Sequence, residues 1–218
     1  HNTETGGRAV IDRLLAGENC ALVTDAGMPA ISDPGEELVA RCAQQSIPVV
    51  TIPGPCALVT ALAASGQPTG RFTFEGFLAM NKKNRRTHLD ALREEERTMI
   101  FYEAPHKLQA TLKDLCLTFG ADRPVSLCRE LTKLHEEVLR FTLAEAVAYY
   151  EENAPKGEYV LVVAGAAPKT GAVVTLEDGV AQVLALKEQG MRLKDAAKEV
   201  AEHTGLSKNE LYAAALER

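Results

Sequence analysis

The chain has 218 residues, 46% of them hydrophobic, which is enough apolar surface for one large or two small buried cores. Its formal charge of −6 at pH 7 disfavours polyanions, so a nucleic-acid-binding surface would have to be a local basic patch. No stretch approaches the roughly 20 apolar residues that span a bilayer, and residues 1–8 lack an apolar signal sequence, so we expect a cytoplasmic protein with no membrane partner.

The five cysteines predict neither a metal site nor a disulfide framework. They are widely spaced along the chain, and no two form a Cys-x-x-Cys pair or a Cys/His cluster with the spacing of metal ligands. We therefore expect reduced thiols that are mostly buried as small apolar side chains.

Residues 1–70 are predicted to form the remainder of an N-terminal α/β domain. Short, continuous apolar runs at residues 20–24 and 48–52 are typical of buried strands, and a loop rich in glycine and proline follows each. Helical periodicity covers residues 8–17, 36–45 and 57–64. The alternation predicts a parallel sheet covered on both faces. Because such a domain normally begins with a strand, we expect that a first strand is absent here.

Residues 71–165 are predicted to form a second α/β domain, which a polar connector at residues 81–86 introduces. Its expected strands span residues 98–102, 124–128, 136–142 and 158–164. Its expected helices span residues 86–96, 107–119 and 143–152.

Residues 166–218 are predicted to be a linker and a helical C-terminal extension. The linker is rich in alanine, proline and glycine, and the rest is helical in pattern with breaks at Gly190 and Gly205. Residues 193–212 have the rhythm of a helix-turn-helix. Because acidic residues interrupt the basic ones, a packing cap without a nucleic-acid role stays equally open.

Three loops follow predicted strands, at residues 25–35, 53–56 and 103–106. Ligands of parallel α/β sheets bind outside the carboxyl ends of the strands, and small residues such as Gly27 and Gly54 let a ligand approach the backbone. Together the loops predict a shared ligand cleft. The chain has no Gly-x-Gly-x-x-Gly, Walker or Gly-x-Ser-x-Gly motif, so nicotinamide, ATP and hydrolase functions lack support.

Charged residues in these loops are candidates for binding or catalysis. Asp25 directly follows a predicted strand and suits a cofactor amine or hydroxyl, whereas Asp33 suits an Asx turn or a helix cap. Glu103, Glu130 and Lys133 also follow strands and reach one edge if those strands are parallel.

Two further features have both a functional and a structural interpretation. His106 suits a proton shuttle or a helix cap. Lys82, Lys83, Arg85 and Arg86 suit a solvated helix start, yet they form the best phosphate-binding patch in this acidic chain.

Five motifs in order resemble one known family. They are LVTDAGMPAISDPG at residues 22–35, PGPCALVTAL at 53–62, FEGFL at 74–78, IFYEAPHKL at 100–108 and CRELTK at 128–133. Together they closely resemble the branch of the tetrapyrrole methylase superfamily that methylates cytidine 2′-hydroxyls of small-subunit ribosomal RNA. The resemblance covers essentially the whole chain, including its helical tail.

The resemblance implies a two-domain α/β fold with a small helical extension, a homodimer, and a 16S rRNA cytidine in the small ribosomal subunit as substrate. It implies S-adenosylmethionine as cofactor, lined by Asp25, Ala26, Gly27, Met28, Ile31, Ser32, Cys56, Ala57, Tyr102, Val163 and Ala164. The loop of Glu130, Thr132 and Lys133 would face the nucleotide. Glu130 and Glu103 are then candidate general bases, and Lys133 would stabilise a developing alkoxide or a phosphate.

The chain departs from the family pattern in two places. We expect the family's first strand and its Thr-Pro-Ile-Gly-Asn-Leu loop to be absent, and Ala79 stands where the family usually has proline. Two other functions stay open: a tetrapyrrole C-methyltransferase of the same superfamily, and a non-catalytic RNA- or ribosome-binding protein on a methylase fold.

Overall fold

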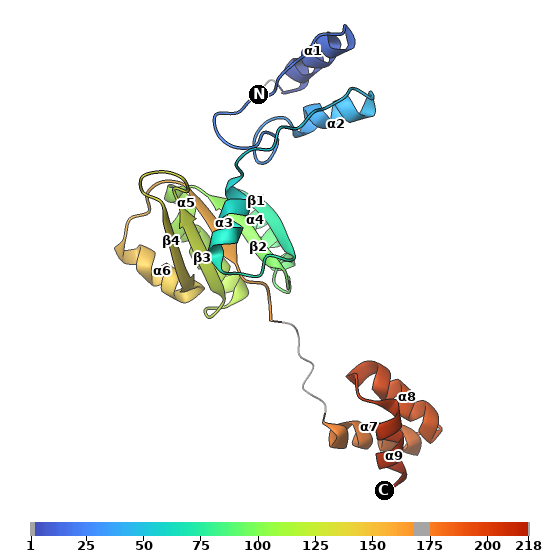
Figure 1. Cartoon of the computed structure of the whole chain (residues 1–218). Helices are drawn as coiled ribbons and strands as arrows, with labels where there is room; N and C mark the ends of the chain where they lie inside the picture. Colours follow the sequence, from blue (N-terminus) through green and yellow to red (C-terminus); the bar gives the residue numbers. More distant parts are fainter. Residues whose placement is uncertain (1–2, 168–174, 218) are drawn as a thin grey trace. The chain divides into compact units, whose positions relative to one another are not determined.

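The computed structural model describes residues 3–167 and 175–217. The chain divides into two compact units on either side of the Ala166–Ala167 bond. The first unit contains a five-stranded sheet with helices, and residues 175–217 of the second unit form three helices (Figure 1). The predicted α/β class with a helical C-terminal extension is confirmed. No helix within the described residues is long and apolar enough to cross a bilayer.

The first unit is built from six helices and five strands among its described residues. The helices are α1 (Thr3–Leu15), α2 (Glu36–Gln44), α3 (Ala57–Ser65), α4 (Lys82–Ala91), α5 (Pro105–Phe119) and α6 (Leu143–Glu152). The strands are β1 (Phe72–Phe77), β2 (Thr98–Glu103), β3 (Pro124–Arg129), β4 (Glu137–Thr142) and β5 (Tyr159–Val163).

The sheet is mixed, with the strand order β1-β2-β5-β3-β4. β1 and β2 are parallel, whereas β5 lies between β2 and β3 and runs antiparallel to both. β3 and β4 form an antiparallel pair. β2 and β3 are both antiparallel to β5, so they run in the same direction as each other and as β1. Their carboxyl ends therefore meet at one edge of the sheet.

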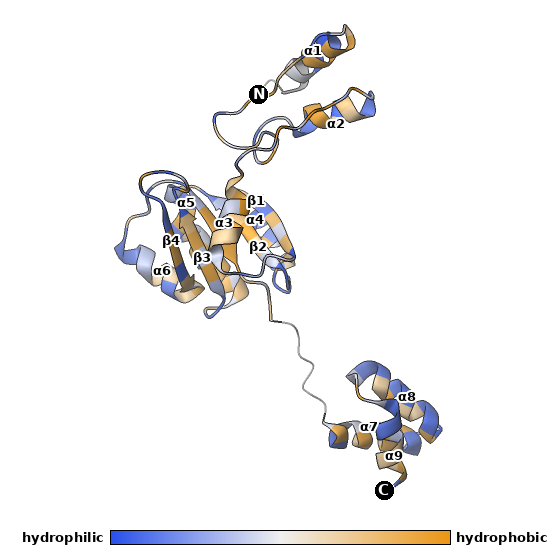
Figure 2. Cartoon of the chain, in the orientation of Figure 1, coloured by the Kyte–Doolittle hydropathy of each residue, from blue (hydrophilic) through white to orange (hydrophobic). Residues whose placement is uncertain are grey.

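Helices cover both faces of the sheet, so all five residues of β5 are buried. Figure 2 shows hydrophobic residues on the strands that these helices cover. On one face α3 packs Leu58, Ala61 and Leu62 against residues of β2, β3 and β5. On the other face α4, α5 and α6 enclose a larger core that includes Phe101 and Leu161. The result is a three-layer arrangement with α3 alone on one side.

Hydrogen bonds from the sheet fix the carboxyl end of α3. The Ser65 carbonyl accepts hydrogen bonds from Ser126 Oγ at 2.9 Å and from Arg140 Nε at 3.0 Å, and Gly66 ends the helix in the left-handed conformation. The Leu58 amide at the other end donates to the Tyr102 hydroxyl. These contacts place the first turn of α3 over the carboxyl end of β2.

The strands expected at residues 20–24 and 48–52 are absent, which corrects the predicted parallel sheet of residues 1–70. Val23, Val50 and Ile52 are 81%, 88% and 82% exposed. A strand needs a neighbour to accept its backbone hydrogen bonds, and no strand lies within residues 3–56 of the described chain. These apolar runs therefore remain extended loops.

Helices α1 and α2 contact each other in this part of the chain, and Ile11 and Cys42 are their buried apolar side chains. The expectation that the cysteines are mostly buried is only partly met, because Cys42 and Cys128 are buried, Cys56 and Cys116 are half-buried and Cys20 is exposed. Cys20 is exposed because its segment pairs with no strand.

The second unit is a small bundle of α7 (Leu176–Glu188), α8 (Leu193–Thr204) and α9 (Lys208–Leu216). Val183, Ala197 and Leu211 lie at its centre. Gly205 ends α8 in the left-handed conformation, and Ser207 caps α9 by accepting from Glu210 N. The helix, glycine, helix rhythm expected from the sequence is thus present between α8 and α9.

Candidate functional site

The candidate site lies at the carboxyl edge of β1, β2 and β3, on the face that α3 covers. Glu103 of β2 and Arg129 of β3 both pair with Tyr159 of β5, so the two strands end at the same level. Half-buried Cys56, Tyr102 and Leu131 pack against the α3 side of the sheet at this edge. The edge thus brings the start of α3 together with the loop after β3.

Tyr102 is at the centre of this cluster. Its hydroxyl accepts a hydrogen bond from Leu58 N at 3.1 Å, and its ring makes edge contacts with Phe74 and Phe77 at centroid distances of 4.9 Å and 5.6 Å. Burial raises the pKa of the Tyr102 phenol, and nearby Cys56 raises it further. The phenol is therefore protonated at neutral pH, and its hydroxyl anchors the first turn of α3.

The loop of residues 25–35 is held against the loop of residues 53–55. Met28 N donates to the Pro55 carbonyl at 3.0 Å, and a Cβ atom on Gly27 would lie 3.3 Å from the same oxygen. Gly27 has a φ of 81°, and Ser32 has a φ of 60° although it is not glycine. Left-handed non-glycine residues are uncommon and concentrate where a loop serves a ligand.

This loop also approaches the end of β1. A Cβ atom on Gly76 would lie 3.9 Å from Ser32 Oγ, and the register of β1 shifts between Phe74 and Gly76. Such bulges bend a strand and are common beside active sites. The predicted cofactor residues Asp25, Ala26, Gly27 and Ile31 are exposed on the same loop. The structure thus brings the loop, Cys56, Ala57 and Tyr102 into one region.

The structure does not bring Val163 and Ala164 together with the other predicted cofactor residues. Val163 pairs with Met99 and Val125, at the opposite end of β2 and β3 from the candidate site. Its side chain is fully buried, and Ala164 N donates to Pro124 O. Because β5 runs antiparallel to β2 and β3, it ends at the other edge of the sheet.

Glu103 is at the correct edge but on the other face of the sheet. Its carboxylate is 3% exposed and accepts hydrogen bonds from Ala104 N at 2.8 Å and from the Thr111 hydroxyl of α5. Met99, Phe101 and Glu103 alternate onto the α5 side, whereas Tyr102 points to the α3 side. The structure therefore does not bring Glu103 together with Glu130 and Lys133.

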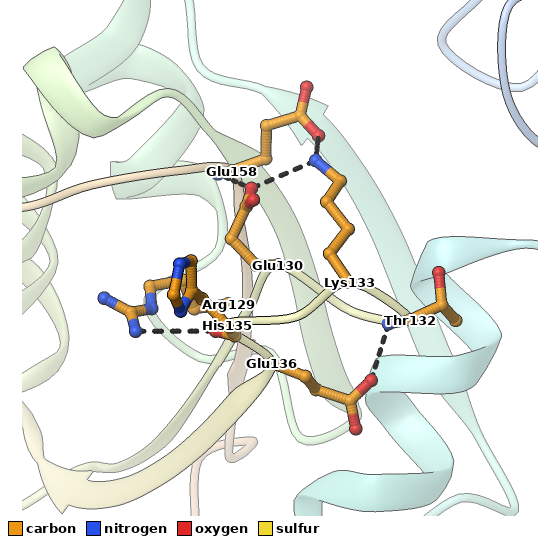
Figure 3. Close-up of polar contacts among 7 residues, drawn as sticks. All are labelled: Arg129, Glu130, Thr132, Lys133, His135, Glu136 and Glu158. Carbon is orange, nitrogen blue, oxygen red and sulfur yellow. Dashed lines mark hydrogen bonds and ion pairs between the residues drawn. The ribbon is translucent and has the colours of Figure 1, made fainter.

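Glu130 and Lys133 form a three-residue network with Glu158 (Figure 3). Lys133 Nζ lies 3.0 Å from Glu130 Oε1 and 2.8 Å from Glu158 Oε2. The Glu158 amide donates to Glu130 Oε1 at 2.8 Å, and the Glu130 amide donates to the Glu158 carbonyl at 3.0 Å. The loop after β3 is thereby joined to the segment that leads into β5.

Two residues of the loop after β3 have left-handed backbone conformations, and a glycine beside them leaves room for the Glu130 side chain. Glu130 and Thr132 have φ angles of 49° and 65°. Gly157 precedes Glu158 with a φ of 77°, and a Cβ atom there would lie 2.4 Å from Glu130 Cγ. Only glycine leaves room for the Glu130 side chain at that position.

The contacts within the network shift the pKa values of Glu130 and Lys133 in opposite directions. Hydrogen bonds from the Glu158 amide and from Lys133 lower the pKa of Glu130, and the carboxylates of Glu158 and Glu130 raise the pKa of Lys133. At neutral pH Lys133 is therefore a cation, and Glu130 is a carboxylate with reduced affinity for a proton. The lowered pKa makes Glu130 a weaker proton acceptor, which disfavours it as a general base.

The predicted basic patch on α4 loses one member. Arg85 is only 11% exposed, lies 2.6 Å from Asp114 of α5 and donates to Thr111. Lys82 and Lys83 are exposed in the first turn, and Arg86 is 77% exposed beside Asp90. Three cations of the predicted four therefore face solvent.

Comparison with known proteins adds to this geometry. Residues 1–147 match the model of the tetrapyrrole (corrin/porphyrin) methylases, and residues 174–218 match the RsmI C-terminal HTH domain. Proteins named ribosomal RNA small subunit methyltransferase I are 46% identical in Synechocystis, covering the whole chain and 78% of that relative, and 47% identical in Halalkalibacterium halodurans, covering 97% and 74%. The Escherichia coli O157:H7 protein of that name is 43% identical and covers the whole chain and 76% of its own length.

The chain belongs to the ribosomal RNA small subunit methyltransferase I family of tetrapyrrole methylases. Solved structures of similar fold include cobalt precorrin-4 methyltransferase, with a TM-score of 0.52 and 18% identity over 74% of this chain and 71% of that one. Diphthine synthase has a TM-score of 0.53 and 12% identity over 75% of this chain and 66% of its own. These two likenesses establish the methylase fold alone.

Sequence reasoning missed Glu158, Gly157 and Phe77 of this methylase. Glu158 and Gly157 precede the last strand, outside the five motifs that pointed to the site. A glycine directly before a charged residue and a buried strand was the available signal. His106 is exposed in the first turn of α5, but Ala104 is the N-cap and no side chain caps the helix, so the helix-cap interpretation of His106 is wrong.

Proposed function

We propose that this protein methylates a cytidine 2′-hydroxyl of 16S rRNA in the small ribosomal subunit, with S-adenosylmethionine as methyl donor and as a homodimer. The observation that carries the proposal is the 43–47% identity, over nearly the whole chain, to relatives named ribosomal RNA small subunit methyltransferase I. The tetrapyrrole alternative has the superfamily model and the fold in its favour but no relative of comparable identity among those named above, so it is less well supported.

The residues at the carboxyl edge fit the proposed cofactor. S-adenosylmethionine supplies an electrophilic methyl group on a sulfonium. The first turn of α3, which has no side-chain cap at Cys56, suits the cofactor carboxylate, because helix N-termini favour anions. Phe77 is 54% exposed beside Tyr102 and suits the adenine ring. Residues 25–32 would enclose the remainder through backbone contacts.

The loop after β3 would face the nucleotide. In-line displacement depends mainly on holding the ribose oxygen on the axis of the bond that breaks. We assign Lys133 to stabilising negative charge on the ribose oxygen or on a neighbouring phosphate. Glu130 and Glu158 then position the ammonium group. The 2′-hydroxyl proton would pass to a water molecule as the C–S bond breaks and the O–C bond forms, so Glu130 is not assigned the general-base role predicted for it. Glu103 would act only by fixing the start of α5.

The proposal is tested with the full chain, labelled S-adenosylmethionine and small ribosomal subunits from cells that lack this methylation. We expect one methyl group per subunit, at a cytidine whose 3′ bond becomes resistant to alkali because the 2′-oxygen is blocked. A methyl group on a base, or methylation of a tetrapyrrole but not of the subunit, would refute the proposal.

The exposed cations of α4 provide a second test. Changing Lys82, Lys83 and Arg86 to Gln should weaken subunit binding and lower its log–log salt slope by about 0.7 to 0.9 for each phosphate that is no longer neutralised. The affinity for S-adenosylmethionine should not change. A wild-type salt slope in the triple variant would remove this patch from the RNA-binding surface.

A further inference from the structure

Helix α9 of the second unit carries apolar side chains on its outer side as well as on its inner side. Leu211 and Ala215 are 0% and 1% exposed at the centre of the bundle. Tyr212 and Leu216 are 39% and 64% exposed, and Ala213 is exposed next to them. At about 3.6 residues per turn, these three outer side chains share an arc of about 100° of the helix. We call Tyr212, Ala213 and Leu216 the α9 stripe.

The neighbouring helix α8 has the polar outer face that is typical of a surface helix. Its buried residues are Ala196, Ala197 and Val200. Its exposed residues are all polar, namely Lys194, Asp195, Lys198, Glu199, Glu202 and His203. A surface helix normally confines its apolar side chains to the side that faces the core. The contrast between α8 and α9 indicates that the α9 stripe is the apolar centre of an interface, for which tyrosine is a common anchor.

The charge around the α9 stripe does not fit a nucleic acid. Residues 175–217 contain eight Asp and Glu residues, all of them exposed, and five Lys and Arg residues. Glu210 of α9 and Glu217 at its end are exposed, whereas Lys208 is the single basic residue of the helix and is half-buried. Such a surface repels phosphate. In addition, the second helix of a helix-turn-helix enters the major groove of B-DNA, but the major groove of A-form RNA is too deep and narrow to be read.

The same charge defines the partner that the α9 stripe fits. An acidic rim is complementary to a basic surface and selects against acidic ones. A protein that binds rRNA has to carry lysine and arginine on its surface. Resting on the function proposed above, we propose that the α9 stripe docks on a basic protein of the small ribosomal subunit. The second unit then holds a protein of the subunit, while the cations of α4 in the first unit hold its RNA.

The first test compares the double variant Tyr212→Ser with Leu216→Ser, in the full chain, with Leu117→Ser. Leu117 is a 79% exposed residue of α5 in the first unit. We expect the double variant to bind intact small subunits about tenfold more weakly, or by about 1.4 kcal/mol, and to bind protein-free 16S rRNA with wild-type affinity. Leu117→Ser should bind both as the wild type does. An equal loss on protein-free rRNA, or no loss on intact subunits, would overturn the proposal.

The second test reverses charge and changes only exposed side chains. Glu210→Lys with Glu217→Lys should weaken binding to intact subunits severalfold, because the rim would then repel a basic partner. A contact with RNA predicts the opposite sign, since added lysines attract phosphate. Glu151→Lys with Glu152→Lys makes the same change of net charge on α6 of the first unit and should not weaken binding. Tighter binding of intact subunits by the Glu210 and Glu217 variant would refute the protein partner.

Two readouts separate this proposal from its alternatives. If the double variant of the α9 stripe sediments as a monomer where the wild type is a dimer, the stripe joins two copies of the chain and the proposal is wrong. Wild-type binding of subunits by a double variant that still methylates them would refute the docking and leave the proposed function standing. A wild-type protein that does not methylate the subunit would refute the proposed function, whereas weaker binding of intact subunits by the double variant would still support the docking.

Discussion

Residues 57–166, here called the sheet body, and residues 3–56, here called the N-terminal segment, contain similar apolar runs but have different packing. In the sheet body, Phe101, Leu127 and Leu161 are completely buried between helices. In the N-terminal segment, Val50 is 88% exposed within an equally apolar run. Both runs have the composition of a buried strand. The difference is that only the sheet body supplies neighbouring strands.

The two regions contribute differently to the stability of the fold and to the candidate site. The sheet body contains the hydrogen-bonded strands and the two apolar cores on its faces. The N-terminal segment supplies the loop at residues 25–35, which approaches the carboxyl edge of the sheet through Ser32 and Met28. We expect substitutions of the buried apolar residues of the sheet body to act mainly on folding, and those in the loop at residues 25–35 to act mainly on ligand binding.

The largest expected effect is a cavity in the sheet body. Leu161→Ala should lower the free energy of unfolding by about 3–5 kcal/mol, because Leu161 is buried in the central strand. Val50→Ala removes a mostly exposed side chain and should change it by less than about 0.5 kcal/mol. Urea denaturation measures both. A comparable loss in Val50→Ala would show that the N-terminal segment is packed in solution.

The next effect distinguishes backbone strain from packing. Gly157 in the sheet body and Gly17 in the N-terminal segment have φ angles of 77° and 88°, but a Cβ atom would meet a neighbour only at Gly157. Gly157→Ala and Gly17→Ala both place alanine in a left-handed conformation and share that backbone strain. Gly157→Ala should lower the free energy of unfolding by about 1–2 kcal/mol more than Gly17→Ala, because Glu130 must also move. It should also lower kcat for RNA methylation. If both variants lose the same stability and activity, the contact with Glu130 is irrelevant.

A smaller effect concerns ligand binding by the N-terminal segment. Gly27→Val should weaken S-adenosylmethionine binding about tenfold, or about 1.4 kcal/mol, because a branched side chain at a φ of 81° displaces the loop from Pro55. The urea midpoint of the sheet body should stay near that of wild type. Calorimetric titration measures the affinity of the variant for S-adenosylmethionine. Unchanged affinity in a folded variant would exclude this loop from the cofactor site.

The smallest effect is the acid stability of the sheet body. Hydrogen bonds from Arg97 hold the pKa of Glu95 at about 2, below its ordinary value of 4.5. A depressed pKa adds stability above pH 4.5 and loses it as the pH falls toward 2. Thermal unfolding of Glu95→Gln should therefore depend less on pH across that window than unfolding of the wild type. Identical pH dependence in both proteins would contradict the assignment.

Much of the sheet body could be predicted from the sequence. The runs at residues 98–102 and 124–128 are strands to within one residue, and α6 has the predicted bounds 143–152, because apolar pattern and capping residues agree there. The direction of β5 could not be predicted, since it depends on which strands flank it. That direction decides at which edge of the sheet Val163 and Ala164 lie.

The pattern of loops after buried strands predicted that the loops after β2 and β3 lie at one edge of the sheet, whereas Tyr102 was named only through the resemblance to the family. Glu103 was misjudged because the prediction used its position after a strand and ignored the alternation that places it with Met99 and Phe101. The partners of Lys133 come from the segment before β5, far along the chain. Contacts between distant segments leave no local pattern in a single sequence.

The position of β5 also has a consequence for the order of folding. β5 is the last strand to be synthesised among the described residues, yet it lies between β2 and β3 and bonds to both. Until residue 163 is available, β2 and β3 each expose an unpaired edge with strongly apolar side chains. Such edges are prone to pairing with other chains. A nascent chain stalled before β5 should therefore be a better chaperone substrate than one stalled in the linker that follows.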